Sequence, residues 1–157
     1  MSTDPRSEME AALKRLVVPE LRRAGFTGSF PHFRRVRQPV DLITFQFDRH
    51  GGGFVIELAT AEPTGFTTHW GKHIPAKQLT AWDLHPDQRR RLKPASGSGA
   101  DSWFRYDASQ PPEAVASDAL SRLRQEYRLA EPDAAPNGGP AAALGDSGAS
   151  GGPPSVS

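Results

Sequence analysis

The chain of 157 residues contains no cysteine, which excludes disulfide bonds, thiolate metal ligands and a cysteine nucleophile. It also contains no apolar run near the ~20 residues that cross a bilayer. Its first residues, MSTDPRSEMEAALKRL, lack the apolar core of a signal peptide. The sequence therefore predicts a cytoplasmic protein that does not associate with a membrane.

Positive charge is also sparse. The formal net charge is +1, and the three acidic residues after position 130, which no basic residue offsets, leave +4 on the rest of the chain. This charge is well short of the concentrated positive field that drives binding to phosphates. Nucleic acid is therefore not an expected partner.

Large aliphatic side chains are almost missing from residues 131–157, where only Leu144 and Val156 occur. The other residues there are mainly Gly, Pro, Ala and Ser, which bury too little surface to offset the entropy lost on ordering. The sequence predicts one folded domain, residues 1–130, followed by a disordered tail, residues 131–157.

Two alternating apolar runs separated by glycines predict a β-hairpin within residues 41–62. Apolar and polar positions alternate in the first arm, and the second repeats the spacing with Glu57 pointing outward, which is the period of a half-buried strand. The apolar positions are Ile43, Phe45 and Phe47 in the first arm and Phe54, Ile56 and Leu58 in the second. Residues 51–53 are glycines, which take positive φ without penalty and form the turn. We expect the rest of the domain to cover this one apolar face.

Two amphipathic helices are predicted on either side of the hairpin. The first begins within residues 4–7, breaks near Val18 because Pro19 cannot donate a backbone hydrogen bond, and ends at Gly25. The second begins at residues 111–113 with two prolines and a glutamate. Its apolar stripe consists of Val115, Ala116, Ala119, Leu120, Leu123 and Tyr127.

Shorter elements complete the predicted fold. Residues 30–37 and 102–107 read as strands and residues 86–93 as a short helix, while residues 72–84 fit a short strand or a covering loop. Together these elements predict an α+β domain with an N-terminal helix, an antiparallel sheet of about four strands, and a C-terminal helix packed on one sheet face.

Several short motifs resemble a bacterial family catalogued as domain of unknown function 4304. They are LRRAGF at the end of the first helix, FRR at 33–35, FQ at 45–46 before the glycine hairpin, and Arg89-x-Arg91 followed by Asp101-x-Trp103. The resemblance covers about residues 9–127 and departs from the family pattern at Ser102-Trp103-Phe104, where a second tryptophan is common. It implies an α+β domain, and the family has no assigned activity.

The candidate ligand-binding residues are Arg35, Gln46, Arg91, Asp101 and Trp103. If they share one rim of the sheet, the arginines can bind an anionic or amide-bearing ligand in a bidentate manner. The alternative is that Arg91 and Asp101 form a structural ion pair, for which arginine is the usual choice.

Two groups of side chains have a functional and a structural interpretation. His69 and His73 have the spacing of metal ligands on a helix, but Gly71 and Pro75 oppose a helix there, so we expect a surface loop, no metal and no cofactor. Arginines within residues 34–37 and 89–91 resemble a basic surface, but we expect acidic residues to pair with them.

No catalytic constellation is present, because the sequence lacks a nucleophile elbow, a phosphate-cradling glycine loop and a paired-carboxylate motif. Trp70, Trp82 and Trp103 are expected in the core or half-buried, and if exposed together they would mark a protein-binding patch. The leading hypothesis is a non-enzymatic binding module with a protein partner. The alternatives are a small-molecule or nucleotide-binding protein or enzyme that uses the Arg/Gln/Asp cluster, and a weak nucleic-acid binder.

Overall fold

The computed structural model describes residues 4–94, 102–106 and 110–129. The chain divides into two compact units, residues 1–123 and 124–157. The first unit contains the sheet and most of the helices, and the described part of the second is the end of the last helix and two following residues. The predicted tail, residues 131–157, lies outside the described residues.

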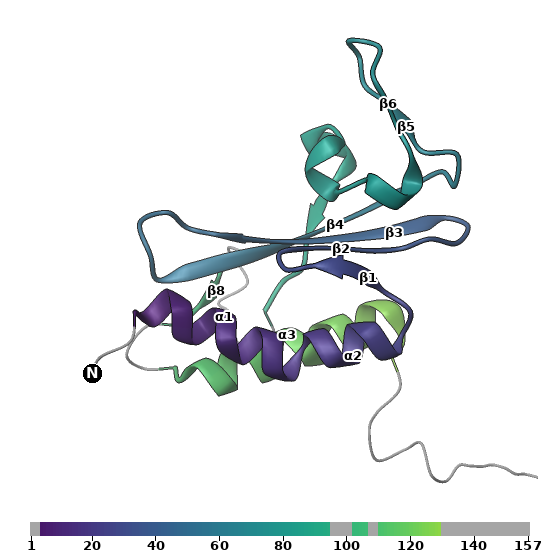
Figure 1. Cartoon of the computed structure of the whole chain (residues 1–157). Coiled ribbons are helices and arrows are strands. Elements are labelled where there is room, and N and C mark those ends of the chain that lie inside the picture. Colours follow the sequence, from purple (N-terminus) through teal and green to yellow (C-terminus); the bar gives the residue numbers. More distant parts are fainter. Residues whose placement is uncertain (1–3, 95–101, 107–109, 130–157) are drawn as a thin grey trace, which may run out of the picture. The chain divides into compact units, whose positions relative to one another are not determined.

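The structure is an α+β fold, as the sequence predicts (Figure 1). The helices are α1 (Pro5–Leu16), α2 (Val18–Arg23) and α3 (Pro112–Tyr127). The strands are β1 (Thr27–Ser29), β2 (His32–Arg35), β3 (Val40–Phe47), β4 (Gly53–Ala61), β5 (Phe66–Thr67), β6 (His73–Ile74), β7 (Arg90–Arg91) and β8 (Phe104–Arg105). Three 3-10 turns follow β6, namely η1 (Ala76–Gln78), η2 (Ala81–Asp83) and η3 (Pro86–Gln88).

Among the described residues, the main sheet is antiparallel and has six strands, in the order β1-β2-β3-β4-β7, with β8 pairing with a different part of β4. Its centre is the predicted hairpin of β3 and β4, in which Phe45 lies opposite Ile56. Asp48 N–H donates to the Gly53 carbonyl across 2.9 Å and closes the glycine turn. The alternation of apolar residues in the sequence thus gives the correct strands and faces.

One side of the sheet, the helix face, is covered by α1, α2 and the residues of α3 before Arg124 (Figure 1). The side chains buried there are aromatic and aliphatic, and each one larger than alanine contributes about 1.5–3 kcal/mol relative to an exposed position. They include Met9, Leu13, Leu21, Phe33, Ile43, Phe45, Phe54, Ile56, Leu58, Phe104 and the predicted stripe of α3 from Val115 to Leu123.

The predicted break in the first helix is present, because α1 ends at Leu16 and α2 begins at Val18. Pro19 stands in the first turn of α2, where its missing N–H costs no hydrogen bond. Gly25 adopts a φ of +101°, and Phe26 N–H donates back to the Leu21 carbonyl across 2.9 Å. This C-terminal motif turns the chain into β1.

The expectation that everything else covers the helix face is wrong. The segment from β5 to η2 lies on the other side of the sheet, here called the opposite face (Figure 1). Apolar residues on that side require a cover, because strand alternation also points Val40, Leu42 and Ala59 away from the helices. They pack with Ile74, Ala76, Leu79, Ala81 and Leu84 in a second core.

Two predicted elements differ from the structure. Residues 86–93 form η3 and the short strand β7 instead of a helix, because an eight-residue helix is marginal alone and pairing with β4 satisfies the backbone. Residues 30–37 contain only β2, since Pro31 has no N–H and lies with Phe30 in the turn between β1 and β2. Among the described helices, none has the length and apolar character needed to cross a bilayer.

Candidate functional site

A row of polar residues crosses the opposite face, beside the second core. His32 pairs with Thr44, Thr44 with Glu57, and Glu57 with Arg91, across four neighbouring strands. Residues directly opposite one another share a face of the sheet, so all four side chains point to the same side. We call these four residues the polar row.

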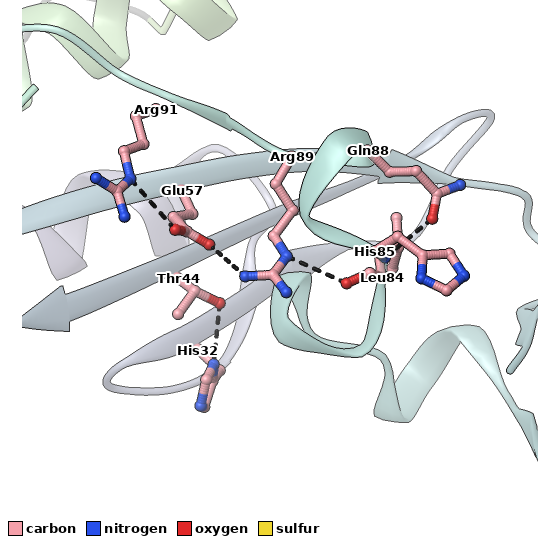
Figure 2. Close-up of polar contacts among 8 residues, drawn as sticks. All are labelled: His32, Thr44, Glu57, Leu84, His85, Gln88, Arg89 and Arg91. Atoms are coloured by element: carbon pink, nitrogen blue, oxygen red, sulfur yellow. Dashed lines mark hydrogen bonds and ion pairs between the residues drawn. The ribbon is translucent and has the colours of Figure 1, made fainter. Parts of the chain in front are cut away.

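Glu57 is the most buried charge of the polar row, with 6% of its surface exposed. Its Oε1 accepts from Arg89 Nη1 across 2.8 Å, and its Oε2 accepts from Arg91 Nε across 3.4 Å (Figure 2). Arg89 Nε also donates to the Leu84 carbonyl across 3.2 Å. Arg89 therefore ties the segment that covers the second core to the central strand of the sheet.

The other end of the polar row holds a neutral histidine. His32 Nδ1 lies 3.0 Å from the Thr44 hydroxyl, and the ring edge meets Trp82 at a centroid distance of 4.9 Å. Burial, aided by the Arg34 cation, lowers the pKa of His32 below its usual 6.5, although Asp83 acts in the other direction. His32 is therefore uncharged at neutral pH.

Arg35 is the first of the predicted ligand residues. It pairs with Asp41 in the register of β2 and β3, and both side chains lie on the helix face. Its Nη2 donates to Asp41 Oδ2 across 2.9 Å, and its Nη1 donates to the Ala24 carbonyl across 3.2 Å. The side chain is only 11% exposed. Arg35 thus anchors the end of α2 to the sheet and does not meet Arg91, which is on the opposite face.

The remaining predicted residues divide in a similar way. Arg91 and Trp103 are brought together, with the guanidinium 5.8 Å from the tryptophan ring centre. Gln46 shares the opposite face but lies in the next row, across from Val55. Asp101 lies outside the described residues. The described part of the cluster therefore does not form one rim.

The sequence alone did not single out Glu57 and Arg89 as a pair, although it predicted that acidic residues, Glu57 among them, neutralise the arginines. That prediction is confirmed for Arg35 and Arg37 with Asp41, and for Arg89 and Arg91 with Glu57. The signal for Glu57 was a single carboxylate inside an otherwise apolar strand, GFVIELATA. A lone charge in such a run requires a buried partner.

A second feature is the hairpin of β5 and β6, residues 66–74, which we call the finger. It forms its own two-stranded sheet and projects from the main sheet (Figure 1). Thr68, at its turn, is buried and exchanges hydrogen bonds with Lys72, one of them from Thr68 N–H to the Lys72 carbonyl at 2.8 Å. Trp70 at the tip is 68% exposed, with the His69 ring against its edge at 4.7 Å.

The tryptophan and histidine expectations can now be compared with the structure. Trp103 is half-buried as predicted, but the prediction is wrong for Trp70 and Trp82, which are 68% and 46% exposed. His73 lies in β6 and bonds to the Thr67 hydroxyl, 3.0 Å away, while the His69 ring lies 5.7 Å from that of His85. Within residues 4–94, 102–106 and 110–129, no three potential metal-ligating side chains gather.

An antiparallel sheet with helices on one face and a second core on the other defines a small α+β domain of the helix-and-sheet layered class. Residues 17–130 match the domain of unknown function 4304. The match spans more than half of the chain, so this protein belongs to that family, as its motifs indicate. Searches among curated proteins and among solved structures found no significant match.

Proposed function

We propose that this protein is a non-enzymatic, cytoplasmic binding module that recognises a protein partner through the finger. The observation that carries the proposal is Trp70, whose indole is 68% exposed at the tip of a projecting hairpin. Tryptophan is among the residues that contribute most to protein–protein binding when a partner buries them.

The finger is suited to presenting this side chain. The paired hydrogen bonds of Thr68 and Lys72 fix the turn, and Gly65 at the base allows the strands to meet closely. A fixed turn loses little conformational entropy when it binds, which favours affinity. His69, Lys72 and His73 are also exposed on the finger, and they supply the polar groups that the rim of such an interface needs.

The contacts of the polar row favour a structural role for its residues over a catalytic one. Glu57 is held by two arginines, and His32 is bonded to Thr44. A general acid or base must be available to a substrate proton, whereas these groups are used to hold the sheet and its cover together.

The test is site-specific photo-crosslinking. A photoreactive phenylalanine at position 70 is expected to trap the partner in a lysate of the native cell, and the identified partner is then purified. Trp70→Ala is expected to weaken binding of that partner roughly 30-fold, the effect of losing a ~2 kcal/mol hot spot.

Val36→Ala is the matched control, because Val36 is an exposed apolar residue (48%) outside the finger. It is expected to leave the affinity unchanged. Equal affinities for the wild type and Trp70→Ala would refute the finger as the recognition element.

A further inference from the structure

A cavity of about 340 Å³ opens at the edge of the main sheet, between α1 and η2. It exists because β2 is shorter than β3. Pairing of the two strands ends with His32 and Thr44, and the last contact is Phe45 N–H donating to the Pro31 carbonyl across 2.9 Å. Beyond this point β3 continues to Phe47 without a neighbour on that side among the described strands.

The exposed strand edge offers backbone hydrogen-bonding groups. Asp48 and Gly53 form a hydrogen-bonded pair of the β3–β4 hairpin, as the 2.9 Å bond shows. The next pair in an antiparallel ladder, Phe47 and Phe54, is of the non-hydrogen-bonded kind. The N–H and C=O of Phe47 therefore point away from β4, toward the open edge.

The walls of the cavity combine aromatic rings and cations. Phe30 and Phe47 lie with ring centres 6.3 Å apart. Arg6 lies over Phe47 at 5.0 Å and Lys14 lies over Phe30 at 5.5 Å. Trp82, which is 46% exposed, forms part of the wall from the side of the opposite face.

The two cations differ in their neutralisation. Arg6 Nε donates to Glu10 Oε2 across 2.9 Å. Lys14 has no carboxylate within ion-pair distance among the residues that the structure describes, so the lining carries one uncompensated positive charge. Gln46 adds an amide that can donate and accept hydrogen bonds.

We propose that this cavity binds a small molecule that combines a planar aromatic or heteroaromatic ring with one anionic group, a carboxylate or a phosphate. The ring packs against Trp82 and the phenyl rings, and the anion contacts Lys14, with Gln46 orienting the ligand. The volume is at the lower end of the range for ligand cavities, which fits a compact ligand. This site is separate from the finger and does not depend on a protein partner.

The test is titration calorimetry, supported by saturation-transfer NMR, with two probes on the full chain. Adenosine 5′-monophosphate represents the phosphates and indole-3-acetate the carboxylates, and their relative affinities identify which anion the site prefers. Adenosine and 3-methylindole, which lack the anion, are expected to bind at least tenfold more weakly than their charged counterparts, because a charge-assisted contact is lost.

Variants locate the site. Lys14→Met keeps the side-chain stem and is expected to weaken the better probe about tenfold, and Gln46→Glu to weaken it at least as much by charge repulsion. Lys77→Met, an exposed lysine outside the cavity, and Trp70→Ala are expected to leave binding unchanged. Circular dichroism of each variant verifies that it is folded.

Three results would overturn the proposal. The first is that neither probe binds at millimolar concentration. The second is that the charged and uncharged compounds bind with equal affinity. The third is that Lys14→Met and Lys77→Met change the affinity equally. Because the finger is tested with a protein partner and this cavity with small molecules, either proposal can fail while the other stands.

Discussion

Replacing Arg89 with methionine tests how the cover of the opposite face is held. The substitution keeps most of the aliphatic stem but removes the 2.8 Å bond to Glu57 and the 3.2 Å bond to the Leu84 carbonyl. Both bonds have the charged guanidinium as donor, and a hydrogen bond to a charged group contributes about 1.5–3 kcal/mol. Breaking a buried pair adds the penalty of a buried, poorly compensated charge, for a total loss of about 3–5 kcal/mol.

The contact between Arg91 and Glu57, which remains in the variant, reduces the expected loss of stability. Arg91 still reaches Glu57, but at 3.4 Å and from a more exposed position. We therefore expect Arg89→Met to lower the free energy of unfolding by about 3 kcal/mol, a large part of the ~5–15 kcal/mol typical of a domain. Urea denaturation followed by circular dichroism measures this change.

The matched control is Arg15→Met. This variant loses the 2.9 Å ion pair between Arg15 and Glu113, whose side chains are both exposed. Exposed pairs contribute about 0–1 kcal/mol, so this variant is expected to stay close to the wild type. In the background of Arg89→Met, Glu57→Gln is expected to restore part of the loss, since it removes the buried charge. A similar, small effect of Arg89→Met and Arg15→Met would refute the reasoning.

Three further predictions concern the sheet and the finger. The pKa of His32 is lower in the folded than in the unfolded chain, so the unfolded chain binds more protons below pH 6.5 and the free energy of unfolding falls as the pH drops below that value. His32→Gln is expected to reduce this dependence of stability on pH in urea titrations. An unchanged dependence would contradict the prediction. In Gly65→Ala, the new Cβ would clash with the Ile74 carbonyl oxygen at a φ of +101°, so amide exchange in the finger is expected to accelerate while β3 and β4 stay protected. Unaltered exchange would exclude this strain. Phe54 is fully buried, and its ring stacks on that of Phe104 with a centroid distance of 5.2 Å. Phe54→Ala is expected to lower the free energy of unfolding by about 3–5 kcal/mol, as measured by calorimetry. A loss below ~1 kcal/mol would disprove tight packing there.

Local chemistry made part of the fold predictable. The period of two around Phe45 and Ile56 specifies both the strands and their buried face, and Pro19 and Gly25 act within one turn of the chain. These signals depend on neighbours in sequence. They therefore need no knowledge of the tertiary structure.

The candidate site depended on pairing between distant segments, which no local pattern specifies. Arg91 meets Glu57 only because β7 pairs with β4 across more than thirty residues of sequence, in one particular register. A shift of that register by one residue would place Arg90 there instead. For the same reason the separation of Arg35 from Arg91 follows from strand order and not from residue type.

The excursion from Glu62 to Arg89 leaves from the end of β4 and returns as β7 beside that same strand. Since it departs from and rejoins one strand, the turn of the finger can change without altering the order of β1 to β4, provided that the residues of the second core are kept. Exchanging only that turn would alter the surface that the finger presents while the framework and the second core stayed constant, much as antigen-combining loops are exchanged on a common sandwich.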